Sequence, residues 1–209
     1  MTRPILYSFR RCPFAMRARL AIVSSGQSVE LREILLRDKP ADMLAASPKG
    51  TVPVLVQDTV IEASIDVMHW ALAQSDPEGL NTHMNDTAHA LVAECDGPFK
   101  TALDLTKYAV RHPDTNPDQS RATAAAFIAK LDAKLNGRAW LLGDHPAMVD
   151  FAILPFVRQF AHTDLEWWDG QPYANAQRWL AAFKASDRFA TIMKKYSHWK
   201  FGNDVILFP

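Results

Sequence analysis

Cysteine is scarce in this chain of 209 residues, which contains only Cys12 and Cys95. Two cysteines far apart in sequence are too few for the disulfide framework that stabilises small secreted domains. Their scarcity excludes that class and indicates a reducing compartment. The hydrophobic content of 48% is instead sufficient for a well-filled core in one large domain or two small ones.

Charge of one sign is not in excess, because Lys plus Arg and Asp plus Glu each number 23. Overall electrostatics therefore favour neither nucleic acid nor an anionic membrane surface as a partner. No run of about 18 apolar residues is present to cross a bilayer. The first residues, MTRPILYSFRR, also lack the apolar stretch of a signal peptide. We expect a cytoplasmic protein with no nucleic-acid partner and no membrane association.

Spacings typical of a metal site are missing as well. The chain has seven histidines, but His83 and His89 are too far apart for ligands on adjacent turns of one helix, and His69 beside Trp70 is expected to pack. We also find no internal repeat and no low-complexity segment. The sequence thus predicts no metal cofactor.

Residues 1–75 combine the patterns of strands and helices. Short apolar runs and apolar–polar alternation predict strands at residues 5–9, 29–35, 51–56 and 59–61. Helical spacing predicts a helix after the RRCP turn, a short irregular helix near residues 40–46 and a helix over residues 64–73. This order indicates an α/β domain.

Residues 87–209 show helical spacing. The turn-forming segment SDPEGLN marks a boundary, and we place a linker at residues 76–86. Pro98 and Pro155 fall inside helical runs, where each is expected to kink the helix or remove a hydrogen bond. The runs lie near residues 89–111, 118–135, 149–163, 174–185 and 189–196. The second domain is therefore predicted to be all-α.

The segment RRCPFAMRARLAI places Cys12 directly before Pro13 at the predicted strand-to-helix turn, so Cys12 is expected at the helix N-cap. There its sulfur would lie beside unpaired amide hydrogens at the positive end of the helix dipole. Four arginines of the segment add positive charge: Arg10, Arg11, Arg17 and Arg19. Such surroundings lower a thiol pKa from about 8.5 to roughly 3.5–7.5. We interpret Cys12 as a reactive thiol rather than a structural core cysteine.

Ala15 occupies the position where a CxxC motif would carry its second thiol. Cys12 must therefore act as a monothiol, and any mixed disulfide that it forms must be resolved by a second thiol from solution. Cys95 falls on a helix of the second domain, where we expect it to pack as a small apolar residue.

The stretch KGTVPVL places Pro53 at the opening of a predicted strand. A proline there cannot donate to the sheet, and two alternatives remain open: an ordinary trans proline of an edge strand, or a cis bond after Val52. With a cis bond, the backbone N–H and C=O of Val52 would face outward and pair with an extended peptide ligand as an added strand.

Together these features resemble a cytosolic glutathione transferase over essentially the whole chain. The order of the elements, CPFA, KGTVPVL, Ser64 at a helix start and GDHPAMVDFAILP in the helical half carry the resemblance. Cys12 matches the catalytic cysteine of the family, and its motif is most similar to the omega class and related bacterial proteins. The resemblance implies an α/β thioredoxin-like N-terminal domain, an all-α C-terminal domain and an active cleft between them.

The resemblance also implies a glutathione-binding role for several residues. Phe14 lies where the family lines the thiol pocket, and Lys39 resembles the lysine that reaches the glycyl carboxylate. Val52 matches the residue whose backbone pairs with the cysteinyl part of glutathione, and Pro53 matches the cis-proline. Ser64 matches the serine whose hydroxyl and amide hold the γ-glutamyl carboxylate at a helix N-terminus.

Two positions depart from the family pattern. The family usually has an acidic residue or glutamine directly before the serine, where it contacts the ligand's α-amino group, whereas this chain has Ala63 there and Glu62 one step earlier. A one-residue shift would let Glu62 substitute, although neighbouring side chains in an extended segment point to opposite sides. In PAMVD, Ala147 replaces the Ser or Thr that typically caps the helix near Asp150.

The helical run near residues 89–111 faces the active cleft in the family. Lys107, Tyr108 and Arg111 are therefore candidates for contact with the acceptor, and a solvated helix face is the alternative for the two cations. Tyr7, where other classes place a catalytic tyrosine, is less favoured because Cys12 is present.

The chemistry that the resemblance implies is thiol transfer. We predict a glutathione-dependent thiol transferase or reductive deglutathionylase that uses glutathione as co-substrate, takes a small electrophilic or disulfide acceptor and forms a homodimer. The alternative is a non-catalytic regulatory or binding protein on the same fold, resembling the stringent starvation proteins. Ala63 favours this alternative, and Cys12 opposes it.

Overall fold

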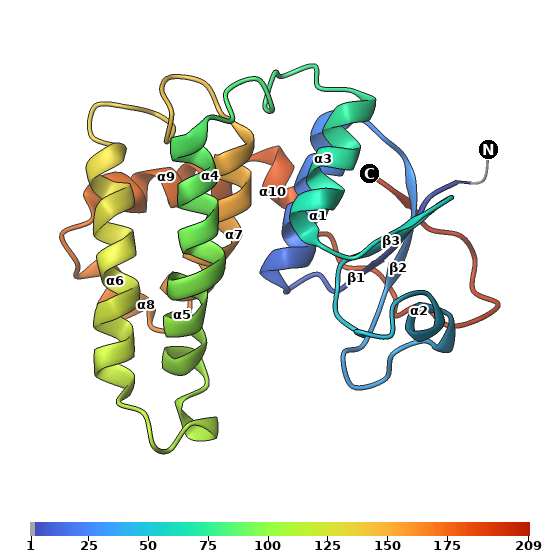
Figure 1. Cartoon of the computed structure of the whole chain (residues 1–209), viewed down its shortest axis with the longest axis horizontal. Coiled ribbons are helices and arrows are strands. Elements are labelled where there is room, and N and C mark those ends of the chain that lie inside the picture. The colour runs from blue at the N-terminus through green and yellow to red at the C-terminus, as the bar shows by residue number, and fades with distance from the viewer. Residues whose placement is uncertain (1–2) are drawn as a thin grey trace. The chain divides into compact units, whose positions relative to one another are not determined.

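Two compact units make up the computed structural model, which describes residues 3–209 (Figure 1). One unit consists of Met1–Asn81 together with Ala185–Pro209, and the other consists of Thr82–Lys184. The sequence predicts residues 87–209 as one helical domain, whereas the segment from Ala185 onward packs with the N-terminal unit. The physical reason is that the end of the chain supplies a strand to the sheet of that unit.

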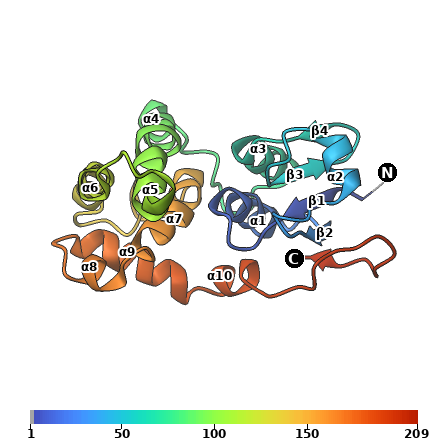
Figure 2. The ribbon, with the colours of Figure 1, turned by 90° about the horizontal axis from the view of Figure 1, so that it is seen from below.

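A mixed sheet with helices on both faces forms the N-terminal unit. Its elements are β1 (Ile5–Ser8), α1 (Pro13–Ser25), β2 (Val29–Glu33), α2 (Ala41–Ala46), β3 (Val54–Val56), β4 (Val60–Ile61), α3 (Ser64–Gln74), α10 (Asp187–Ile192) and β5 (Leu207–Phe208). The strand order is β4-β3-β1-β2-β5. Strands β1 and β2 are parallel, and the other neighbours are antiparallel. Figure 2 shows α1 and α3 on one face of this sheet and α2 on the other.

The local sequence explains why these elements form. In β2, VELRE alternates buried and half-buried residues, as expected for a strand. Helix α1 begins at Pro13, whose fixed φ suits the first helical turn, and ends at Gly26, which adopts a left-handed φ of 67°. Leu20 and Ile22 of α1 are fully buried, and α1 packs closely against α3.

The C-terminal segment adds the fifth strand of the sheet. Strand β5 pairs with β2, and Phe208 lies opposite Val29. The Trp199 N–H donates to the Glu33 carbonyl at 2.7 Å, and Phe208 is fully buried. The sequence does not predict β5, because a strand of two residues has no periodicity of its own and depends on a partner far away in the chain.

The second unit is all-α, as predicted. Its elements are α4 (Asp86–Glu94), the π-helix η1 (Cys95–Phe99), α5 (Lys100–Lys107), the 3₁₀-helix η2 (Ala109–Arg111), α6 (Pro117–Lys134), α7 (Met148–Ala161), α8 (Leu165–Asp169) and α9 (Ala174–Ala185). The π-helix contains Pro98, which lacks the N–H for a regular helical bond, so the expected irregularity is a π-turn. No helix within residues 3–209 is long and apolar enough to cross a membrane.

Ala147 is the N-cap of α7, at the position that the sequence indicates. The Ala147 N–H donates to Asp150 Oδ2 at 2.9 Å, and the Leu141 N–H donates to Oδ1 at 2.9 Å. Ala147 has no side-chain oxygen to complete the reciprocal bond of a capping box. Burial raises the pKa of Asp150 to about 6, although the bonds from Leu141 and Ala147 act in the opposite direction. The start of α7 therefore depends on a buried carboxyl group.

Candidate functional site

Cys12 lies at the N-cap of α1, as its position before Pro13 predicts. Its backbone is extended, with φ −76° and ψ 124°. The Cys12 N–H donates to the Phe9 carbonyl at 2.9 Å, and the Cys12 carbonyl accepts from the Met16 N–H at 2.9 Å. The side chain is half-buried. The thiol is thus at the positive end of a helix, where the dipole favours a thiolate.

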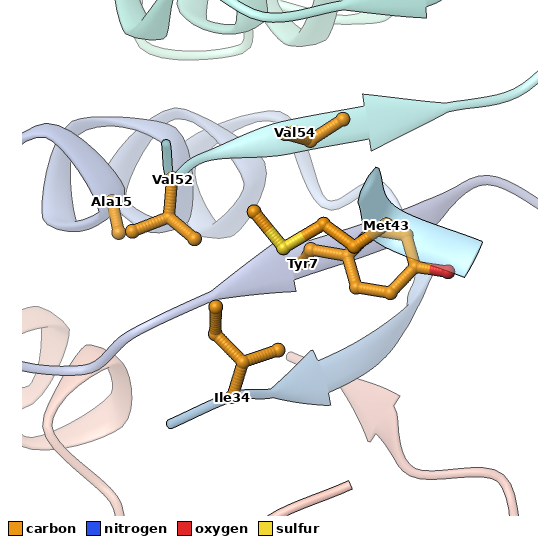
Figure 3. Packing of buried hydrophobic residues seen from close by; sticks show 6 residues of the cluster. All are labelled: Tyr7, Ala15, Ile34, Met43, Val52 and Val54. Carbon is orange, nitrogen blue, oxygen red and sulfur yellow. The ribbon is translucent and has the colours of Figure 1, made fainter. Parts of the chain in front are cut away.

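The Cys12 side chain packs against a cluster of buried apolar residues. Figure 3 shows the buried members of this cluster. Its Sγ lies 3.8 Å from the Val52 carbonyl oxygen. The Val52–Pro53 bond is cis. The buried members of the cluster are Tyr7, Ala15, Ile34, Met43, Val52 and Val54. The sequence analysis selects Cys12 and Val52 as site residues from two separate motifs, and the structure brings these two residues into contact.

Ser64 is the first residue of α3 and is buried. Arg17, which is fully buried in α1, donates from Nη1 to Ser64 Oγ at 3.3 Å. The Arg17 guanidinium also lies 5.5 Å from the centroid of the Phe14 ring. Arg17 contacts two predicted site residues, whereas the sequence analysis includes it only among the positive charges around Cys12. Helical spacing shows that Arg17 lies on α1, but it does not identify the partner of its guanidinium.

Lys39 reaches the loop that leads to Val52. A Cβ added at Gly50 would lie 3.4 Å from Lys39 Nζ, so the ammonium is directly beside the Gly50 backbone. Gly50 has a left-handed φ of 62°, which glycine adopts without steric cost. Lys39, which the resemblance assigns to the glycyl carboxylate of glutathione, thus lies beside the start of the KGTVPVL segment.

Ala63 is the exposed N-cap of α3 and has no side-chain acceptor. The Glu62 carboxylate accepts a hydrogen bond from Ser47 Oγ, so it is engaged by the loop that precedes Gly50. An open cavity of about 430 Å³ is lined by Lys49, Val60, Ile61, Glu62, Ala63 and Asp66. Glu62 thus lies beside Ala63, but its carboxylate already has a protein partner.

The charge of Arg19 is neutralised by a protein partner, although the sequence analysis counts it among the positive charges near Cys12. It is fully buried and forms a salt bridge with Glu33. Its Nε donates to Ser8 Oγ at 2.8 Å, and its Nη1 donates to the Ile192 carbonyl at 3.0 Å. Burial lowers the pKa of Arg19, and the Glu33 carboxylate opposes this effect. Because Glu33 compensates its charge, Arg19 contributes less positive potential at Cys12 than the sequence indicates.

The Tyr7 hydroxyl is bound by Arg32 and is not directed toward the thiol. Arg32 Nη1 donates to Tyr7 Oη at 2.7 Å. Burial raises the pKa of Tyr7, and Arg32 acts in the opposite direction. In Figure 3 the hydroxyl points away from Ala15 and Val52. A tyrosine with a raised pKa is not an activated hydroxyl, which agrees with the lower preference that the sequence gives it.

Lys107, Tyr108 and Arg111 lie together at the end of α5. Lys107 is the last residue of the helix, Tyr108 is its C-cap and Arg111 ends η2. Lys107 Nζ lies 5.0 Å and Arg111 Cζ 4.6 Å from the centroid of the Tyr108 ring, so two cations contact one aromatic ring. The predicted run to residue 111 is divided in the structure, because the regular helix ends at Lys107 and the 3₁₀-helix η2 covers Ala109–Arg111. Helical backbone stops directly before His112, the residue that Pro113 restricts.

Cys95 is fully buried at the start of η1. This burial agrees with the expected role of a small packing residue. Within residues 3–209, no group of three or more His, Cys, Asp and Glu side chains is arranged to hold a metal ion.

Family models match both parts of the chain. The model described as glutathione S-transferase, N-terminal domain, matches residues 6–77. The model described as glutathione S-transferase, C-terminal domain, matches residues 109–182. The two matched segments include Cys12, Val52 and Ser64 in the first and Arg111 in the second.

Curated relatives include two glutathione S-transferases. The chain is 30% identical to glutathione S-transferase GstB of Escherichia coli (strain K12) over 153 residues, which cover 66% of this chain and 71% of that protein. It is 26% identical to glutathione S-transferase omega-1 of Mus musculus over 165 residues, which cover 77% of this chain and 68% of that protein.

Solved structures share the fold at low sequence identity. A glutathione transferase family member from Pseudomonas fluorescens pf-5, solved with two glutathione bound, has a TM-score of 0.79 at 15% identity and covers 91% of this chain and 92% of its own. Poplar glutathione transferase F1 has a TM-score of 0.76 at 14% identity, with coverages of 92% and 97%. These structures share the order found here, a thioredoxin-like domain followed by a helical one.

Proposed function

The chain belongs to the glutathione S-transferase family, and we propose that it is a cysteine-type, omega-like member that acts as a thiol transferase or reductive deglutathionylase. The observation that carries the proposal is the position of Cys12. Its thiol lies at the N-terminus of α1 and 3.8 Å from the Val52 carbonyl. The helix N-terminus favours the thiolate form of the sulfur. The Val52 carbonyl instead accepts from the thiol and marks the backbone that can pair with a peptide.

In the proposed reaction, the Cys12 thiolate attacks the glutathionyl sulfur of a mixed disulfide between glutathione and an acceptor. A Cys12–glutathione disulfide forms, the bond between glutathione and the acceptor breaks, and the acceptor thiolate leaves and takes a proton from water. The thiolate of a second glutathione then attacks the glutathionyl sulfur. Glutathione disulfide is released, and the Cys12 thiolate is regenerated.

In this proposal, glutathione lies along the edge that the Cys12 and KGTVPVL segments form. Lys39 binds the glycyl carboxylate, the Val52 backbone pairs with the cysteinyl part, and Ser64 binds the γ-glutamyl carboxylate. Phe14 and the cis Pro53 shape the thiol end of the site. The position of Lys39 beside Gly50 and the Cys12–Val52 contact support this assignment.

The acceptor side and the assembly are also part of the proposal. We assign Lys107, Tyr108 and Arg111 to the pocket of a small electrophilic or disulfide acceptor, because the two cations around Tyr108 suit an anionic or aromatic group. We further propose a cytoplasmic homodimer with no metal cofactor, no nucleic-acid partner and no membrane association.

Replacement of the nucleophile tests the proposed function. We expect Cys12→Ser to abolish transfer between glutathione and a mixed disulfide while the circular dichroism spectrum stays that of the native protein. Iodoacetamide labelling of the native protein over a pH series should show a thiol that titrates well below about 8.5, the value of free cysteine.

Cys95→Ser is the matched control, because Cys95 is fully buried and should contribute neither labelling nor activity. Full activity in Cys12→Ser, or a thiol that titrates at or above the free value, would contradict the mechanism.

A non-catalytic regulatory protein on the same fold is the second candidate, and Ala63 is the observation that favours it. The methyl group of Ala63 has no acceptor atom and therefore cannot accept a hydrogen bond from the α-amino group of glutathione. The proposed enzyme should be retained on a glutathione column and show a Cys12 thiol that titrates well below the free value, whereas a regulatory protein need do neither.

A further inference from the structure

Arg17 is a buried cation that connects α1 with the start of α3. It is fully buried, its Nη1 lies 3.3 Å from Ser64 Oγ, and its guanidinium lies 5.5 Å from the Phe14 ring centroid. Arginine keeps its charge at all physiological pH values. A permanent positive charge therefore lies directly behind the hydroxyl that begins α3.

The hydrogen bond between Arg17 and Ser64 has one direction. A guanidinium has only donors, so Arg17 donates and Ser64 Oγ accepts. The single proton of the Ser64 hydroxyl can then be donated to another group. The first amides of α3 point toward the same end of the helix, and the Ala63 side chain cannot accept from them. A carboxylate is the ligand group that suits a hydroxyl donor, these amides and a nearby positive charge.

We propose that Arg17 is a positioning residue for the γ-glutamyl carboxylate of glutathione. It directs the Ser64 O–H toward that carboxylate and supplies a positive charge behind it, in surroundings of low dielectric where charge acts strongly. This inference rests on the proposed function, because it takes glutathione as the ligand. The contact with the γ-glutamyl carboxylate matters more in this chain, because Ala63 cannot accept a hydrogen bond from the α-ammonium of the same γ-glutamyl group.

Arg19 provides the internal comparison. It lies on the same helix and is equally buried, but its guanidinium binds Glu33, Ser8 and the Ile192 carbonyl. Its contacts join α1 to β2 and to the C-terminal segment, so a substitution there affects structure without a contact to Ser64. Arg19→Lys is therefore a matched control for Arg17→Lys.

Calorimetric titration with two ligands separates positioning from a structural role. Glutathione carries the γ-glutamyl group, and cysteinylglycine lacks it. Arg17→Gln should weaken glutathione binding about tenfold or more, while the affinity for cysteinylglycine stays nearly unchanged. Arg17→Lys, which keeps the charge, should recover part of the loss. In a Ser64→Ala background, Arg17→Gln should have a smaller effect, because both residues act on the same carboxylate.

If Arg17→Gln does not fold, the inference is tested by comparing Arg17→Lys with Arg19→Lys in the same two titrations. Arg17→Lys should lower the preference for glutathione over cysteinylglycine about threefold, since lysine lacks the planar fork of arginine. Arg19→Lys should leave that preference unchanged. An equal loss for both ligands, or no loss for either, overturns the inference.

The wild-type titration distinguishes this inference from the proposed function. If the wild-type protein binds no glutathione at millimolar concentration, both fail together. If the wild-type protein binds glutathione and the Arg17 variants retain its preference over cysteinylglycine, only the role of Arg17 is overturned.

Discussion

Ala63 presents a methyl group next to Ser64. In the proposed binding mode, a carboxylate at this position would contact the ammonium of the γ-glutamyl group. The neighbouring Glu62 carboxylate is engaged by Ser47 Oγ. A hydrogen bond between a carboxylate and an ammonium is worth roughly 1.5 to 3 kcal/mol, and each 1.4 kcal/mol is about tenfold in affinity. We therefore predict that Ala63→Glu tightens glutathione binding about tenfold or more, as measured by calorimetry.

Glu62→Ala is the matched control for this prediction. It should leave the affinity for glutathione nearly unchanged, because the Glu62 carboxylate is bound to the protein. If Glu62→Ala alone destroys binding and Ala63→Glu adds nothing, then Glu62, and not position 63, provides the contact with the ammonium of the γ-glutamyl group.

Single residues also show what sequence reasoning can reach. The order Cys-Pro predicts the N-cap of α1, and KGTVPVL predicts the strand β3. Both predictions rest on local patterns. Val52, which precedes this strand, contacts the Cys12 thiol. The roles of Arg17 and Arg19 are not local. Both lie on α1 two positions apart, yet Arg17 binds Ser64 and Arg19 binds Glu33. Only the packing of α1 against other elements distinguishes Arg17, the positioning residue that we propose, from Arg19, which has a structural role.

At the level of elements, we predict that the stability contributed by the start of α7 depends on pH. Burial raises the pKa of Asp150 from 3.8 to about 6, so the folded protein holds this proton more tightly than the unfolded chain. The stabilising contribution is fully present below about pH 4 and is lost as the pH rises to about 6. One pKa unit is worth about 1.4 kcal/mol, so the loss is on the order of 3 kcal/mol. Urea unfolding at pH 4, 5, 6 and 7 measures it.

Asp150→Asn removes the titrating group and is the comparison for this pH series. The free energy of unfolding of the wild-type protein relative to the variant should fall from pH 4 to pH 6 and stay constant above that. The opposite slope would mean that the bonds from the Leu141 and Ala147 amides outweigh burial and hold the carboxyl group ionised.

Elements whose limits depend on local chemistry follow from the sequence, and those that depend on distant partners do not. Pro98 inside a helical run indicates an irregular turn, and the structure has a π-helix there. Strand β5 is different, because its two residues are defined by pairing with β2. The same distant pairing explains why residues 185–209 look like part of a helical domain in sequence but pack with the N-terminal unit.

At the level of the whole molecule, a segment late in the sequence completes the sheet of the N-terminal unit. The sheet that carries the Cys12 turn receives its outer strand from the last residues, and β5 covers an edge of β2 that would otherwise have unpaired N–H and C=O groups. Phe208 also lies over the buried Arg19, with the guanidinium carbon 5.7 Å from its ring centroid. The core of the N-terminal unit therefore combines residues from two segments that are far apart in the sequence.

We predict that Phe208→Ala strongly destabilises the protein, because Phe208 is fully buried against the sheet. Loss of a buried phenylalanine ring costs about 3 to 5 kcal/mol, and loosening of β5 would also expose the β2 edge to aggregation. Phe201→Ala is the matched control, since Phe201 lies in the same segment but is 92% exposed, and its loss should change stability by no more than about 0.5 kcal/mol. Chemical denaturation with light scattering measures both effects. Equal stability of the two variants would show that β5 is not part of the cooperative core, and that the segment before β2 and the helices α1 and α3 hold the sheet without it.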